Sequence, residues 1–337
     1  MGIENINWYP GHMKKTRGLI QENLRMADVV LEVADARIPI SSRNPIIDEL
    51  VGGKSRLILL NKRDLADESE SARWVEALRG GKTDVLPLNS MSGDGIKALL
   101  KSLAQLQDAR NAGSARKRPL RAMIAGVPNV GKSSLINRLA GRKSAKTGDR
   151  PGVTRGKQWL SLGNGMQLLD TPGILWPKFE DPKTGLFLAF CGSIKDEIMD
   201  MESLALELVK VLAGGYPLLL EKRYGVAVPE NGAESGGPDL EGGTASGGPD
   251  LGSGALPGGP DLGSGEAPEN GAESGSADAA LTADEARNVR GLEIMEAIAR
   301  RRGFIKQGGK VDYERTARTV LDEFRGGLIG KITLEKA

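Results

Sequence analysis

Short apolar runs alternate with stretches of helical spacing along the first half of the chain. Five apolar runs that end in polar residues are predicted to be buried strands: 29–35, 56–61, 84–89, 120–126 and 166–170. Helical spacing between them predicts helices over 16–27, 69–79, 94–107 and 132–140. Strand–helix alternation is typical of an α/β fold, with a mostly parallel sheet covered by helices on both faces. Ligands of such sheets bind at the carboxyl ends of the strands.

The pattern becomes helical after residue 173. Helices are predicted over 184–191, 201–213, 216–224, 282–302 and 312–325. We therefore expect a sheet domain with an N-terminal extension over 1–177 and an all-helical domain over 178–337.

The helical domain is interrupted by residues 229–277, which contain 15 glycines, nine acidic residues and no lysine or arginine. This composition cannot bury enough apolar area to offset the entropy of ordering, so it predicts a disordered acidic linker rather than an ordered Gly-rich loop.

Composition excludes several classes of protein. The chain has 337 residues and one cysteine, Cys191, so it has no intramolecular disulfide framework and no Cys-rich zinc site, and we expect a reducing compartment, the cytoplasm. It has no run of 18 apolar residues, so we expect no membrane insertion. The formal charge is only +2, but outside 229–277 there are 46 basic against 35 acidic residues, a balance of +11.

Residues 126–133 match the phosphate-binding pattern G-x-x-x-x-G-K-[ST], between a predicted strand and a predicted helix. Glycines let backbone N–H groups turn toward phosphate oxygens, and the helix N-terminus adds positive potential. Lys132 would reach the β- and γ-phosphates and Ser133 would bind Mg²⁺. The residues predicted to contact the nucleotide here are Asn129, Val130, Gly131, Lys132, Ser133 and Ser134.

Two further motifs complete a nucleotide site. Asp170 begins the string DTPG at a strand end, where its carboxylate can hold Mg²⁺ while the Gly173 N–H faces a γ-phosphate. The string NKRD at 61–64 offers Asp64 as acceptor for the N1–H and N2–H₂ donors of guanine, which adenine does not present. Lys62 can lie along the base, and Asn61 can tie this loop to the phosphate loop. Together the motifs predict GTP or GDP with Mg²⁺.

The order of these motifs is unusual. NKRD (61–64) and Asn89–Gly93 precede the phosphate loop and DTPG, whereas Ras-like GTPases place the base-reading motifs last. The sequence therefore resembles a circularly permuted GTPase, and more closely the YlqF/RbgA family of large-ribosomal-subunit assembly GTPases. The strings that carry the resemblance include WYPGHM (8–13), DAR-IP (35–39), GVPNVGKSSLIN (126–137), KTGDRPGVT (146–154) and RRGFIKQGGKVDYERTA (301–317).

The resemblance also implies roles for individual residues. Thr154 would close on Mg²⁺ and the γ-phosphate, Ser90 would belong to the second base-side loop, and Asn129 would help to hold a K⁺ ion. Ile174 stands where Ras-like enzymes often have a water-positioning glutamine. The resemblance assigns the catalytic role instead to His12, the single histidine of the chain, whose imidazole could orient the attacking water. The alternative for His12 is a loop histidine that bonds to backbone or contacts RNA.

Three basic clusters suit a phosphate backbone: 110–121, 138–157 and 300–310. The resemblance implies ribosomal RNA of the large subunit as the partner, without DNA specificity. It also implies a monomer whose GTP hydrolysis is stimulated by the large subunit and which leaves the subunit once GTP is hydrolysed. Two alternatives stay open: an RNA scaffold that binds nucleotide but scarcely hydrolyses it, and a tRNA-modification or ion-transport GTPase.

Overall fold

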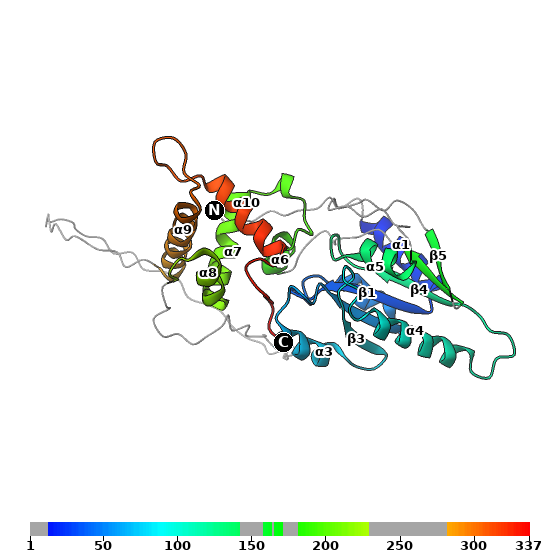
Figure 1. Cartoon of the computed structure of the whole chain (residues 1–337). Helices are drawn as coiled ribbons and strands as arrows, with labels where there is room; N and C mark the ends of the chain where they lie inside the picture. The colour runs from blue at the N-terminus through cyan, green and yellow to red at the C-terminus, as the bar shows by residue number, and fades with distance from the viewer. Residues whose placement is uncertain (1–12, 142–157, 164, 171–180, 229–281) are drawn as a thin grey trace, which may run out of the picture.

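The computed structural model describes residues 13–141, 158–163, 165–170, 181–228 and 282–337. Figure 1 shows a sheet with its helices beside a second group of helices. The strands are β1 (Val29–Asp35), β2 (Ser55–Asn61), β3 (Thr83–Pro87), β4 (Leu120–Ala125), β5 (Gln158–Gly163) and β6 (Met166–Asp170). The helices of the sheet half are α1 (Met13–Met26), α2 (Pro45–Val51), α3 (Glu68–Leu78), α4 (Ile96–Asn111) and α5 (Lys132–Leu139). Those of the helical half are α6 (Pro182–Phe190), α7 (Met201–Gly215), α8 (Pro217–Tyr224), α9 (Ala283–Arg302) and α10 (Tyr313–Arg325), with a short 3₁₀ turn at Asp196–Ile198.

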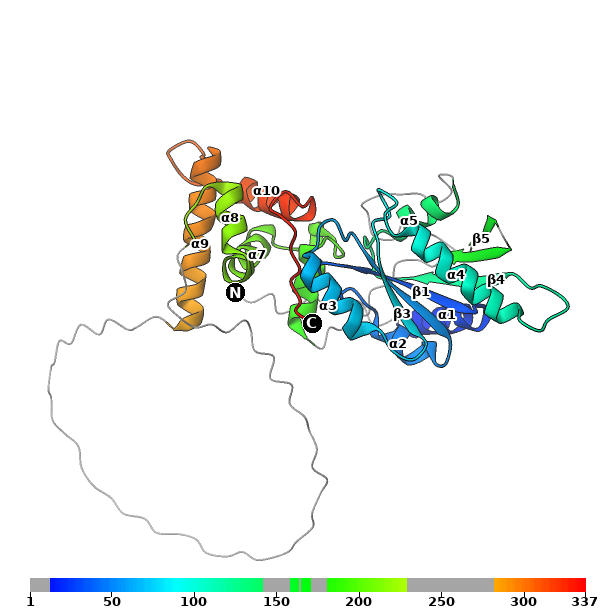
Figure 2. The same cartoon turned by 60° about the horizontal axis from the view of Figure 1, so that its bottom comes forward.

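The sheet has the strand order β3-β2-β1-β4-β6-β5 and is parallel except for β5, which runs antiparallel to β6. The central strand β1 is buried at all seven positions, because helices cover both faces of the sheet. In Figure 2, α1 and α2 lie on one side of the sheet and α4 and α5 on the other. The predicted α/β fold with a mostly parallel sheet is confirmed.

Two elements were missing from the sequence-based expectation. Helix α2 has only seven residues, too few for helical spacing to show, and it is set by its ends: Asn44 accepts a hydrogen bond from the Ile46 N–H, and Pro45 occupies the first turn. Strand β5 is a six-residue edge strand with a register shift between Ser161 and Gly163. An edge strand pairs on one side only, so its sequence needs no continuous apolar run.

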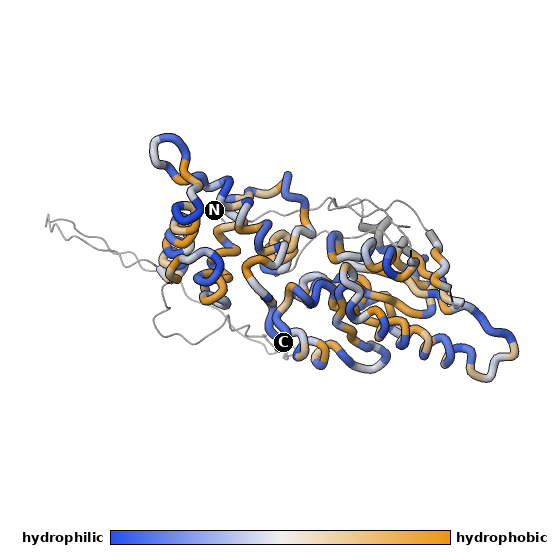
Figure 3. The backbone as a smooth tube through the Cα atoms, viewed as in Figure 1, coloured by the Kyte–Doolittle hydropathy of each residue, from blue (hydrophilic) through white to orange (hydrophobic). Residues whose placement is uncertain are grey.

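The helical half is built around α7, which packs against α9 and α10. Leu204, Leu208 and Leu212 of α7 are fully buried, as is Ile298 of α9. In Figure 3 the apolar positions gather inside this group and along the strands, while the loop between α4 and β4 is mostly hydrophilic. No single helix among the described residues is long and apolar enough to cross a membrane, although the bent pair α7 and α8 reaches the required length and composition together.

Residues 326–337 form a C-terminal tail that returns to the sheet half (Figure 2). The Ile332 N–H donates to the Leu65 carbonyl at 2.9 Å, and the Leu334 N–H donates to the Arg37 carbonyl at 2.8 Å. The Trp74 indole of α3 donates to the Glu335 carbonyl at 3.0 Å. The tail therefore joins α10 to the loops that follow β1 and β2.

Candidate nucleotide-binding site

The loops at the carboxyl edge of the sheet are joined by one buried side chain, Asn61 at the end of β2. Its amide nitrogen donates to the Val130 carbonyl of the phosphate loop at 2.6 Å and to Ser90 Oγ at 3.1 Å. Its oxygen accepts from the Ser90 N–H at 2.9 Å. Asn61 is 1% exposed, so these bonds form away from water. The expected link from the NKRD loop to the phosphate loop is present in the structure.

The phosphate loop has the backbone of an anion cradle. Gly126, Asn129 and Gly131 have φ values of 153°, 60° and 97°, in the region that glycine enters freely and other residues rarely. A side chain on Gly131 would collide with the Asn61 amide. Gly131 also precedes α5 without a side-chain cap among the described residues, so the first N–H groups of α5 face the loop with the positive end of the helix dipole.

Lys132 is the first residue of α5 and is buried, with 8% of its surface exposed. Its ammonium donates to the carbonyls of Gly126 and Val127, at 3.0 and 2.7 Å. The charge of this lysine is thereby held inside the concave side of the loop, where a phosphate group would bind.

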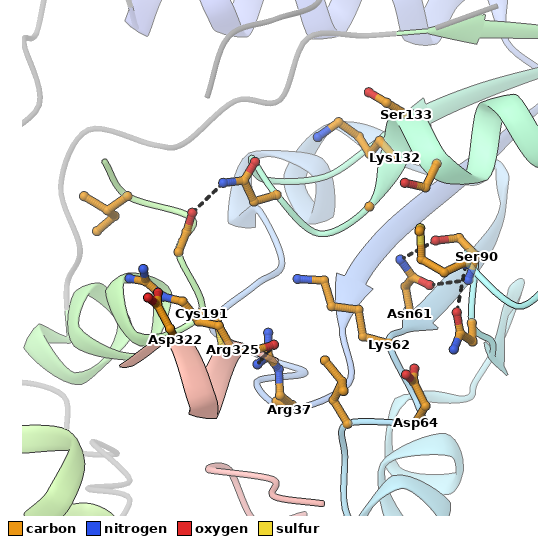
Figure 4. Close-up of a pocket in the computed structure, with 18 of the residues that line it drawn as sticks. Arg37, Asn61, Lys62, Asp64, Ser90, Lys132, Ser133, Cys191, Asp322 and Arg325 are labelled. Carbon is orange, nitrogen blue, oxygen red and sulfur yellow. Dashed lines mark hydrogen bonds between the residues drawn. The ribbon is translucent and has the colours of Figure 1, made fainter. Parts of the chain in front are cut away.

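A cavity of about 1140 Å³ lies between these loops and the helical half, which is large enough for a nucleoside triphosphate. Figure 4 shows Lys132 and Ser133 on one side of it, and Asn61, Lys62, Asp64 and Ser90 on another. The opposite wall comes from the helical half and includes Cys191, Asp322 and Arg325. The cavity is therefore formed jointly by the two halves of the chain.

Direct hydrogen bonds fasten the phosphate loop to the loop after α6. The Asn129 amide donates to the Gly192 carbonyl at 2.6 Å, and Ser193 Oγ donates to the Pro128 carbonyl at 2.9 Å. Cys191, beside them, is buried, and burial raises the pKa of its thiol to about 12. The phosphate loop is therefore bonded directly to the helical half.

A buried ion cluster lies beneath the NKRD loop (61–64), which we call the base-reading loop. Asp35, at the end of β1, is the direct sheet partner of Asn61. Its carboxylate pairs with Arg37 at 2.8 Å and with Lys62 at 2.9 Å. Burial favours the neutral acid, but the two cations outweigh it and hold the pKa of Asp35 well below its ordinary value. The carboxylate therefore stays ionised at every physiological pH.

The structure brings most of the predicted nucleotide residues together around one cavity. Those that line it are Asn61, Lys62, Asp64, Ser90, Asn129, Gly131, Lys132, Ser133 and Ser134, and Val130 lies within the same loop. His12, Thr154, Gly173, the linker 229–277 and the predicted domain boundary at 177 lie outside the described residues. Asp170 is the last residue of β6, beside Ile124 of β4 in the sheet.

Residue patterns alone did not assign a role to Asp35, Arg37 or the wall from the helical half. A usable signal existed for Asp35: it is a polar residue at the end of a buried strand, next to the strand that carries Asn61. The contribution of Arg325 had no such signal, because it depends on how the helices dock.

Comparison with known proteins gives a consistent result. A family model described as "50S ribosome-binding GTPase" matches residues 121–209. Ribosome biogenesis GTPase A of Bacillus cereus is 38% identical over 334 residues, which cover 98% of this chain and 93% of that protein. Mitochondrial ribosome-associated GTPase 1 of the mouse is 39% identical over 219 residues, 60% of this chain and 66% of that protein.

Two solved structures cover nearly the whole chain. The GDP-bound structure of TM YlqF matches with a TM-score of 0.57 and 26% identity, over 94% of this chain and 98% of that one. The GNP-bound YlqF from T. maritima matches with a TM-score of 0.55 and 25% identity, over 96% and 98%.

Proposed function

Because the chain belongs to the ribosome biogenesis GTPase A (YlqF/RbgA) family and is a GTPase that acts in ribosome assembly, we propose that it binds the maturing large ribosomal subunit and leaves it when GTP is hydrolysed. The description "50S ribosome-binding GTPase" of the matching family model supports the choice of subunit. We also propose that the protein acts in the cytoplasm as a monomer, without membrane insertion or DNA specificity.

The cavity that joins the base-reading loop to the phosphate loop carries the nucleotide part of this proposal. Asn61 bonds to both loops, so a base at Asp64 and phosphates at Lys132 would be held at a fixed separation. Lys132 would neutralise the β- and γ-phosphates, and the N–H groups at the start of α5 would bind their oxygens.

The residues present also fit a Mg²⁺ ion. The Ser133 hydroxyl lines the cavity at the first turn of α5, and Asp170 ends the strand next to the one that precedes the phosphate loop. Hydroxyl and carboxylate oxygens are the ligands that Mg²⁺ prefers, and the ion would neutralise phosphate charge. Thr154 and the Gly173 N–H would complete the γ-phosphate side, and His12 would orient the attacking water.

Two described basic clusters supply the surface for ribosomal RNA. Arg116, Lys117 and Arg118 are exposed in the loop before β4. At the other end of the molecule the exposed cluster comprises Arg300, Arg301, Arg302, Lys306 and Lys310. Phosphate-backbone binding through such clusters weakens steeply with salt.

GTP turnover measured with and without large ribosomal subunits, in K⁺ and in Na⁺, tests the proposal. We expect turnover to rise with added subunits and to fall when His12→Ala replaces the wild type, while GTP affinity stays nearly unchanged. A further rise in K⁺ over Na⁺ would support a K⁺ ion at Asn129. GTP turnover that is the same with and without large subunits would refute release of the protein on hydrolysis and favour the nucleotide-binding scaffold.

A further inference from the structure

Lys62 has an unusual backbone at the base side of the cavity. Its φ of 61° lies in the left-handed region, which residues other than glycine seldom occupy and which tends to occur at functional sites. From there the side chain extends into the space between Asn61 and Arg37 (Figure 4). Its Nζ lies 2.9 Å from Asp35 Oδ2, and only 25% of the side chain is exposed. The left-handed backbone thus directs the amine to a fixed acceptor.

The acceptor is itself held rigidly. The Asp35 side chain is 1% exposed and accepts from Arg37 Nε at 3.0 Å, from an Arg37 terminal nitrogen at 2.8 Å and from the Arg37 N–H at 3.1 Å. One carboxylate therefore serves two cations, and only one of them, Lys62, belongs to the base-reading loop.

Arg37 connects this carboxylate to the helical half. Its guanidinium also donates to the carbonyls of Phe324 and Arg325 at the end of α10, at 3.4 and 3.5 Å. It stacks 5.1 Å from the centre of the Phe324 ring. A cation is favourable at a helix C-terminus, so the docked α10 fixes Arg37, and Arg37 fixes Asp35.

We propose that Asp35 is a positioning residue for the guanine nucleotide: its carboxylate holds the Lys62 side chain in place for the base, and Arg37 links that position to the docking of α10. The inference rests on the proposed placement of the base at the loop 61–64. A free lysine side chain loses much rotamer freedom when a ligand orders it, and a lysine already ordered by Asp35 avoids that loss on binding. Removing the carboxylate should therefore weaken nucleotide binding about tenfold.

A double-mutant cycle with a fluorescent GDP analogue tests this link. The affinities of wild type, Asp35→Asn, Lys62→Met and the double variant are compared by titration. If Asp35 acts through Lys62, Asp35→Asn weakens binding about tenfold in the wild-type background and has no further effect beside Lys62→Met. A merely structural role would lower affinity equally in both backgrounds, which would overturn the proposal.

Two further variants keep the test decisive. Asp35→Asn leaves Arg37 buried without its partner, so the same cycle is run with Asp35→Asn and Arg37→Gln combined, which removes both buried charges together. The matched control is Glu32→Gln, because Glu32 is the other buried carboxylate of β1 and pairs with Arg43 and Arg56 instead of the base-reading loop. We expect Glu32→Gln to leave GDP affinity unchanged.

The outcomes separate this inference from the proposed function. If Lys62→Met weakens GDP binding and Asp35→Asn does not, the base is correctly placed and the inference alone fails. Tighter binding by Asp35→Asn would mean that the carboxylate withholds Lys62 from the nucleotide, which also overturns the inference. Wild-type affinity of Lys62→Met would overturn the placement of the base itself.

Discussion

Replacement of Asn61 by alanine should separate the two loops of the nucleotide site. Asn61 makes three buried hydrogen bonds, two to Ser90 and one to Val130, at distances between 2.6 and 3.1 Å. A buried hydrogen bond contributes about 1 kcal/mol net, so Asn61→Ala should lower the free energy of unfolding by about 3 kcal/mol. GDP affinity should fall at least about tenfold, because the base-reading loop and the phosphate loop lose their fixed separation.

Chemical denaturation and GDP titration measure these two effects, and Asn44→Ala provides the control. Asn44 is also a buried asparagine, 2% exposed, but it caps α2, away from the cavity. Loss of that cap should cost about 1 kcal/mol of stability and leave GDP affinity intact. If Asn61→Ala bound GDP as tightly as Asn44→Ala and unfolded at the same denaturant concentration, the assignment of Asn61 as the link between the loops would be wrong.

Two other predictions follow from particular residues. Burial raises the pKa of Glu32 from 4.5 to about 7 although Arg43 partly opposes it, so the folded state binds the proton more tightly than the unfolded state. The free energy of unfolding should therefore fall by about 3 kcal/mol as the pH rises from 4.5 to 7. Thermal melting at a series of pH values measures this fall, and Glu32→Gln should flatten that part of the curve. Gly131→Ala should weaken GDP binding at least about tenfold, because its new methyl group would meet the Asn61 amide and lie 3.3 Å from Ser90 Oγ. Gly141→Ala shares the positive φ but meets no described atom within 4 Å, so equal losses of GDP affinity in the two variants would contradict a role for close packing at Gly131.

The sequence was most informative where local chemistry decides the structure. A strand that is buried on both faces needs a nearly continuous apolar run, so β1 could be predicted from the run VVLEVAD. The phosphate loop could be predicted from its glycines, which the tight turn requires. The bond from Asn61 to the phosphate loop was also predictable, because both follow strands of a parallel sheet, and the carboxyl ends of parallel strands lie along the same edge.

The features that the sequence did not predict depend on docking between segments that are far apart in the chain. Arg37 looks like an ordinary loop cation in the sequence, yet it is 1% exposed because α10, nearly 290 residues away, closes over it. Lys132 was expected to face phosphates, and its bonds to Gly126 and Val127 inside its own loop had no signature in the residue pattern. No local periodicity encodes where a helix docks, so the cavity wall around Cys191 and Arg325 required the structure.

The returning C-terminal tail has a consequence for the way the molecule is made. Protein synthesis proceeds from the N-terminus, so Trp74 leaves the ribosome 261 residues before its partner Glu335. The loops after β1 and β2 of the nascent sheet half therefore remain uncovered until α10 and the tail have emerged. Contacts of such long sequence separation form slowly, since a long loop must close first. The base-reading side of the site is thus translated first and completed last.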